Sequence, residues 1–79
     1  MNNKEKYDQV FLACFSLEMS ELNDGLVYNS ITKWDSIGHM QMIAALEETF
    51  DIMMETDDII DFSSYNKGFK ILEKYGIKF

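Results

Sequence analysis

Hydrophobic residues recur at a helical spacing near the start of the chain. Five of them fall at i, i+3, i+4, i+7 and i+8, which is one face of a helix: Tyr7, Val10, Phe11, Cys14 and Phe15. This stripe predicts a first helix over residues 4–17. Because Cys14 lies inside the stripe, we expect a packed core thiol that burial keeps unreactive.

The helical period lapses from Glu18 to Asp35, where residues that favour turns are mixed with scattered hydrophobic ones. A connection of this length inside a compact domain is uncommon, and it indicates either a functional loop or an unrecognised element. We expect an ordered loop that Leu26 and Ile31 pin to the core, with room for one short helical turn.

The helical pattern resumes after this loop. Three more helices are predicted, over residues 36–50, 56–61 and 64–75. Thr56 and Ser63 are expected to cap the last two, since their hydroxyls can accept hydrogen bonds from first-turn amides. Lys74 lies in the final turn and Gly76 just past it, as helix ends favour. The predicted fold class is all-α: a single domain, residues 1–79, forming a four-helix bundle of three longer helices and one short helix.

The helix predicted over residues 36–50 carries two apolar faces. At about 100° per residue, one face is an ordinary core stripe: His39, Met42, Ile43, Leu46 and Phe50. The opposite face is a narrow apolar strip with acids at its edges: Ile37, Met40, Ala44, Glu47 and Glu48. A helix in a small bundle needs only one apolar face. The strip therefore indicates a docking face for a basic partner, although single surface hydrophobics are also common and need no such role.

Charge narrows the kinds of partner. The 79 residues include 14 acids against 7 lysines and no arginine, which gives a net charge of −7. Nucleic acids and membrane surfaces attract basic proteins, so we expect neither, and expect partners with basic patches instead. Half of the acids lie between Glu47 and Asp61, a stretch without a base. A loose divalent-cation site on Asp57, Asp58 and Asp61 is a weaker option, because no EF-hand spacing is present.

The remaining composition excludes several classes of protein. One cysteine and one histidine cannot form an internal disulfide or a multi-ligand metal site of their own. No run approaches the length of a membrane-spanning helix, and the first residues lack the apolar run of a signal peptide. We expect a monomer in the cytoplasm.

Ser36 has two interpretations. It could cap the second helix, but a capping box would place Glu or Gln where His39 stands. If Asp35 is the cap, Ser36 is the first helical residue, and its hydroxyl is free beside unpaired amides, where a phosphate is favoured. Trp34 is then expected to pack back over His39. A nucleophilic triad is not indicated, because His39 faces the core and no Gly-x-Ser-x-Gly is present.

Asp35-Ser36-Ile37, followed by the run from Met42 to Phe50, resembles the acyl carrier proteins. Their signature is Asp-Ser-Leu at the start of the second helix, leading into a run close to Ala-Leu-Glu-Glu-x-Phe. The resemblance also covers chain length, helix order, the long first loop and acidity. Trp34 and the Gly38-His39 pair are more similar to stand-alone carriers of specialised pathways than to housekeeping fatty-acid carriers.

The resemblance implies a carrier that is not itself an enzyme. A phosphopantetheinyl transferase would attach 4′-phosphopantetheine from coenzyme A to Ser36, with Asp35 in a supporting role. Acyl- or aminoacyl-loading ligases and acyl-transfer or condensing enzymes would be further partners, docking on the strip that contains Ile37, and the bound cargo would be a thioester. The alternative function is an unmodified acidic adaptor whose strip binds a basic partner directly.

Overall fold

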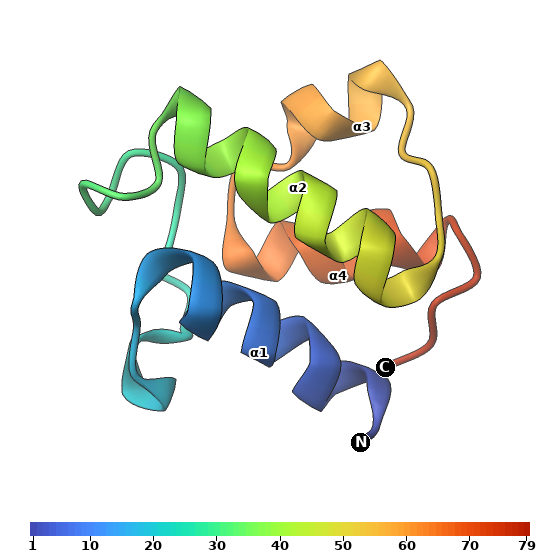
Figure 1. Cartoon of the computed structure of the whole chain (residues 1–79), viewed down its shortest axis with the longest axis horizontal. Coiled ribbons are helices and arrows are strands. Elements are labelled where there is room, and N and C mark those ends of the chain that lie inside the picture. Colours follow the sequence, from blue (N-terminus) through green and yellow to red (C-terminus); the bar gives the residue numbers. More distant parts are fainter.

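Four helices that pack against one another form the computed structural model of residues 1–79 (Figure 1). The elements in chain order are α1 (Asn3–Phe15), the 3₁₀ turn η1 (Met19–Glu21), α2 (Ser36–Phe50), α3 (Thr56–Asp61) and α4 (Tyr65–Glu73). α1 and α2 lie against each other and run in opposite directions. The chain has no strand, only one isolated bridge between Val27 and Ser64. The predicted all-α fold of three longer helices and a short one is confirmed.

Several helix ends differ from the prediction by one or two residues, because other residues cap them. α2 has its predicted bounds, α3 ends at Asp61 as predicted, and α4 ends at Glu73 instead of residue 75. α1 ends at Phe15 because Ser16 adopts the left-handed conformation, with φ at 53°. Ser64, not Ser63, caps α4, and its hydroxyl accepts from the Lys67 amide at 2.9 Å. Thr56 is the first residue of α3 rather than its cap, and Glu55 precedes it without a side-chain cap bond.

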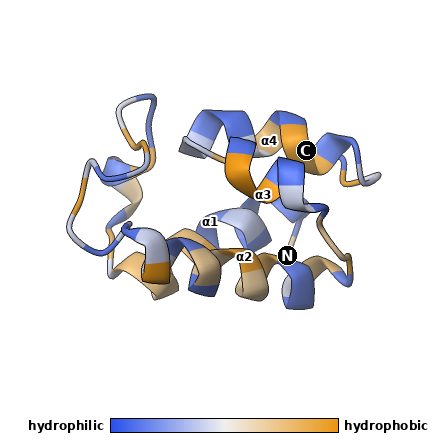
Figure 2. Ribbon diagram, turned by 90° about the horizontal axis from the view of Figure 1, so that it is seen from above, coloured by the Kyte–Doolittle hydropathy of each residue, from blue (hydrophilic) through white to orange (hydrophobic).

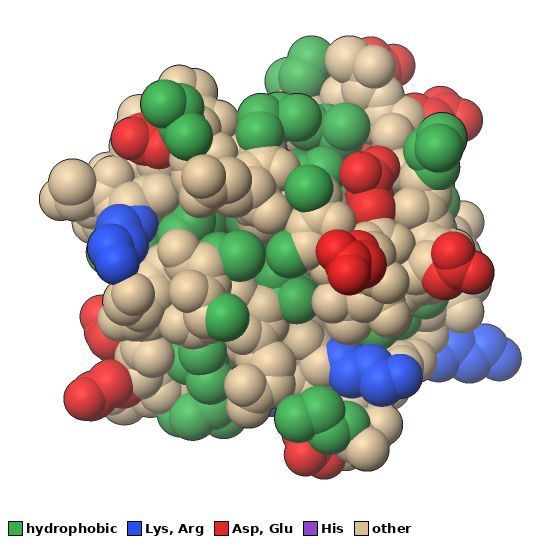
Figure 3. Space-filling view, in the orientation of Figure 1, with side chains coloured by type: hydrophobic (Ala, Val, Ile, Leu, Met, Phe, Trp, Pro, Cys, Tyr) green, Lys and Arg blue, Asp and Glu red, His purple; other side chains and the backbone are tan.

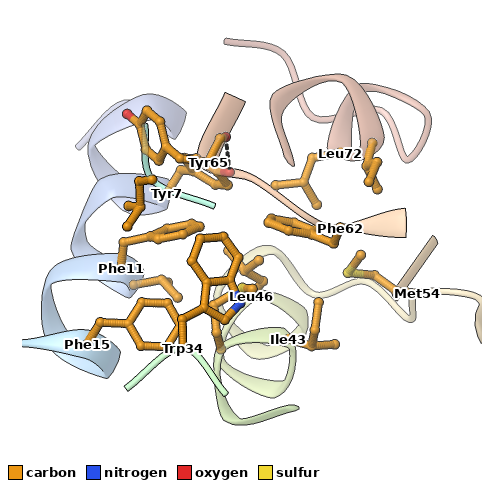
Figure 4. Packing of buried hydrophobic residues seen from close by; sticks show 14 residues of the cluster. Tyr7, Phe11, Phe15, Trp34, Ile43, Leu46, Met54, Phe62, Tyr65 and Leu72 are labelled. Atoms are coloured by element: carbon orange, nitrogen blue, oxygen red, sulfur yellow. Dashed lines mark hydrogen bonds between the residues drawn. The ribbon is translucent and has the colours of Figure 1, made fainter. Parts of the chain in front are cut away.

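An aromatic core joins all four helices (Figure 4). Phe11 lies at its centre, with rings from α1, the first loop, the segment between α3 and α4, and α4 around it: Tyr7, Phe15, Trp34, Phe62 and Tyr65. The predicted stripe of α1 is buried except at Cys14, which is only half-buried at the edge of the core. The predicted packing of the thiol against the core is confirmed only in part, since Cys14 is half-buried; this burial raises the pKa of Cys14.

The loop between α1 and α2 is ordered through backbone pairing with the start of α4. Leu26 is buried and Ile31 half-buried, as predicted. The amide of Tyr28 donates to the Ser63 carbonyl at 2.8 Å, and the amide of Tyr65 donates to the Leu26 carbonyl at 2.9 Å. This pairing lies directly before α4, and its bridge joins Val27 to Ser64, the residue that caps the helix. The loop thereby holds Trp34 and Asp35 at a defined place before α2.

Candidate functional site

The first turn of α2 presents Ser36 to solvent. Asp35 is the cap: it has extended backbone angles, and its Oδ1 accepts from the Gly38 amide at 2.8 Å. Ser36 is the first helical residue and is exposed, and the cap bond does not use its hydroxyl. The structure therefore confirms the interpretation in which Asp35 caps and Ser36 stays free. The unpaired amides and the dipole of this 15-residue helix favour negative charge at this end.

Gly38 lets the preceding loop approach the first turn closely. A Cβ built at this position would collide with the carbonyl oxygen of Lys33 and would also crowd the ring of Phe15. Lys33 is held in turn by a 2.7 Å hydrogen bond from its Nζ to the Ser16 hydroxyl. The sequence analysis noted Gly38 only as a departure from the carrier pattern. The close approach depends on the path of the loop, which no local pattern encodes.

Trp34 and His39 are buried on either side of Ser36 in the chain and contact each other. The indole of Trp34 is fully buried and stacks on the His39 ring, with centroids 6.2 Å apart and an angle of 13° between the planes. Its Nε1–H donates to His39 Nδ1 at 2.9 Å. The predicted packing of Trp34 over His39 is confirmed, and His39 faces the core. It is engaged on both ring nitrogens, since Nε2 lies 2.8 Å from the Ile59 carbonyl oxygen of α3.

Hydrophobic and hydrophilic residues alternate along the ribbon of α2 (Figure 2), and part of its outward surface is apolar. Ile37 is 70 % exposed and Met40 53 % exposed, and Ala44 and Glu48 are also exposed. Figure 3 shows acidic side chains gathered beside the C-terminal half of α2. The positions predicted for the strip therefore lie on the surface as expected, with one exception among the acids.

That exception is Glu47, which has an intramolecular partner. Glu47 is half-buried. Its Oε2 accepts a hydrogen bond of 2.9 Å from the amide of Met54, in the segment between α2 and α3. Glu47 therefore shapes this connection and offers a partner less free charge than Glu48. Two further exposed apolar residues, which the sequence pattern did not single out, lie outside α2: Ile60 of α3, 71 % exposed, and Met53 in the segment before α3.

The acidic stretch is less free than its sequence indicates. Asp58 is buried. Its Oδ1 accepts a hydrogen bond from Lys74 Nζ at 2.5 Å, and its Oδ2 accepts one from the Tyr75 hydroxyl at 2.5 Å. These two donors lower the pKa of Asp58. The stretch from Glu47 to Asp61 contains no base, but Asp58 is paired with a base from outside it, Lys74 at the end of α4. No group of three metal-ligating side chains is close enough to hold an ion, so the divalent-cation option loses its support.

An open hollow lies beside the first turn of α2, between α1 and the loop. Its volume is about 420 Å³, and the residues around it are mostly polar: Cys14, Thr32, Lys33, Asp35, Ile37, Gly38 and Gln41. Asp35 and Ile37, the neighbours of Ser36, lie at its rim. The surface near Ser36 thus offers polar contacts on one side and the apolar strip on another.

Comparisons with protein-family models, with curated proteins and with solved structures find no match to this chain. None of its helices is both long and apolar enough to cross a lipid bilayer.

Proposed function

We propose that the protein is a carrier that holds acyl or aminoacyl groups as thioesters on a 4′-phosphopantetheine arm attached to Ser36. The observation that carries the proposal is the free, exposed hydroxyl of Ser36 in the first turn of a helix that Asp35 already caps. A serine needed as a cap would lose a structural bond on modification, and Ser36 would lose none. The resemblance of its surrounding sequence to acyl carrier proteins supplies the chemistry.

The charges near Ser36 suit a phosphodiester. A phosphate on this hydroxyl would lie near first-turn amides that have no partner within the helix. Asp35 uses Oδ1 for its bond to the Gly38 amide, which leaves its other oxygen for contact with the modifying enzyme. The chain then acts as substrate and shuttle: a phosphopantetheinyl transferase supplies the arm from coenzyme A, and the thiol of the arm carries the cargo.

Partner enzymes would dock next to the attachment point. Ile37 and Met40 supply exposed apolar contact area, and Glu48 supplies charge for a basic patch. These partners would be the transferase, a loading ligase, and acyl-transfer or condensing enzymes. The proposal includes a cytoplasmic location, where coenzyme A is available as the donor of the arm.

The test is intact mass after incubation with coenzyme A, magnesium and a promiscuous phosphopantetheinyl transferase. We expect the wild-type chain to gain one phosphopantetheine, and Ser36→Ala to gain none while keeping its helical circular dichroism. Ser63→Ala is the matched control, because Ser63 is also exposed and also precedes a helix; this variant should be modified like the wild type. Modification of Ser36→Ala, or a folded wild type that resists several transferases, would overturn the proposal.

The second candidate is an unmodified adaptor, which the exposure of Ile37, Met40 and Ile60 favours. An adaptor would bind its partner through the strip whether or not Ser36 is present. Binding that survives Ser36→Ala but falls with Met40→Glu, on a chain that no transferase modifies, would establish it.

A further inference from the structure

His39 is a buried polar side chain with two hydrogen bonds, and the proposed chemistry does not use it. The residue is 9 % exposed. It contacts two segments outside α2: α3, through the carbonyl of Ile59, and the loop before α2, through Trp34 and through Tyr28, whose ring centroid lies 5.6 Å away, edge-on. Such a residue links elements that the chain connects only through loops.

The two hydrogen bonds of His39 require one tautomer. The indole N–H of Trp34 can only donate, so His39 Nδ1 must accept and carries no proton. In the neutral ring the proton then lies on Nε2, where it can donate to the Ile59 carbonyl. This carbonyl belongs to the last turn of α3, where carbonyl groups have no partner within the helix. One histidine thus satisfies a buried donor and an unpaired acceptor from two different segments.

Ser36 lies one helical turn before His39 on α2, since the two residues are three apart. The hydrogen bond between the His39 ring and the Ile59 carbonyl joins α3 to this part of α2. The bonds of His39 therefore restrain the N-terminal turns of α2, where Ser36 lies, relative to α3.

We propose that His39, as its Nε2–H tautomer, is a positioning residue for the modification of Ser36. It joins the N-terminal turns of α2 to α3, so that the transferase meets Ser36 and Met40 on a helix end whose orientation is already fixed. This inference rests on the proposed function, since it concerns how Ser36 is presented. It adds a role for a side chain that contacts neither the arm nor the hydroxyl.

The experiment compares three variants of the full chain. His39→Leu removes both hydrogen bonds at similar volume, and His39→Gln keeps a side-chain acceptor and a donor. Leu72→Ala is the stability control, because Leu72 is fully buried in the last turns of α4 and makes no contact of this kind. We measure kcat and KM of the transferase, amide exchange in α3, and the fluorescence of Trp34, the only tryptophan.

We expect His39→Leu to lower kcat/KM about tenfold, mainly through KM, because the docking surface is no longer preformed. Its α3 amides should exchange faster, and its Trp34 emission should change. His39→Gln should restore kcat/KM to within about threefold. Leu72→Ala should lower the melting temperature, but KM should stay unchanged when it is measured for both proteins at a temperature where they are folded.

Several results would overturn the positioning role. They are an unchanged KM in His39→Leu, an equal loss in Leu72→Ala, or a ¹⁵N spectrum of the wild type that places the proton on Nδ1. A wild-type chain that is not modified at all gives a different result: it overturns the proposed function, and the positioning role with it. If the wild type is modified and His39→Leu is modified with the same KM, only the positioning role is overturned.

Discussion

Single residues at the start of α2 determine how Ser36 is presented. The Asp35 cap and the close approach of the Lys33 carbonyl to Gly38 together set where the helix begins. Asp35 could be predicted from sequence, because a capping acid is a local feature. The requirement for glycine could not, since the atom that would collide with a Cβ comes from the loop.

We predict that Gly38→Ala destabilises the protein by about 1–3 kcal/mol, although alanine favours helices, because the new Cβ collides with backbone that cannot rotate away. Thermal or urea unfolding measures the change. Gly25→Ala is the control: its Cβ would meet only the Asn23 side chain, at 3.2 Å, on an exposed loop. Equal stability of Gly38→Ala and the wild type would contradict the described path of the loop.

At the scale of elements, α3 is held mainly by its neighbours. It has six residues and no side-chain cap at its start, and a helix this short is not stable by itself. His39 binds its C-terminal end from α2, and Lys74 and Tyr75 bind Asp58 from the end of α4. Tyr75 also accepts from the Glu55 amide at 2.9 Å. The Asp58 cluster, with Lys74 and Tyr75, thus fixes both α3 and the segment before it.

The Asp58 cluster predicts a defined dependence of stability on pH. Because the folded-state pKa of Asp58 is lowered, its contribution is complete above the ordinary aspartate value, about 4, and is lost as the pH falls through the lowered folded value. Asp58→Asn should therefore melt below the wild type at neutral pH, and the difference should shrink in acid. Melting temperatures between neutral pH and acid measure this.

The neighbouring acid provides the control for this measurement. Asp57 lies in the same turn of α3 but is exposed, so Asp57→Asn should change the melting temperature little at any pH. If Asp57→Asn and Asp58→Asn had the same profile, the cluster would contribute nothing specific to stability.

At the scale of the whole molecule, charge is segregated. Six of the seven lysines lie on α1, on α4 or near the C-terminus: Lys4, Lys6, Lys67, Lys70, Lys74 and Lys78. The acids of α2, α3 and the segment between them have few lysines near them in the chain. The molecule measures 29 × 27 × 20 Å, so most charges lie within a few screening lengths of one another.

We predict that moderate sodium chloride raises the melting temperature by a few degrees, because it screens the repulsion within a net charge of −7. Magnesium chloride at the same ionic strength should add little, since no three ligating side chains converge. Differential scanning calorimetry across both salt series measures this. A melting temperature that fell with salt would mean that attractive pairs outweigh repulsion at the surface.

The sequence by itself determined the features that depend on local chemistry. The periods of 3.6 residues predicted four helices, because burial of one face is what stabilises an amphipathic helix. The second apolar face of α2 followed from spacing within a single helix, and the bounds of α2 agree with the prediction for the same reason. The sequence also offered Asp35 as a cap with Ser36 free, as one of two interpretations, and the structure selects it.

Only the tertiary structure decided the features that depend on residues far apart in the chain. The partner of Asp58 comes from α4, the acceptor of His39 Nε2–H from α3, and the obstacle to a side chain at Gly38 from the loop. Glu47 binds an amide seven residues away across a break in the helix. Such pairings arise when the helices pack, and the burial they create determines which of the polar groups remain free for a partner.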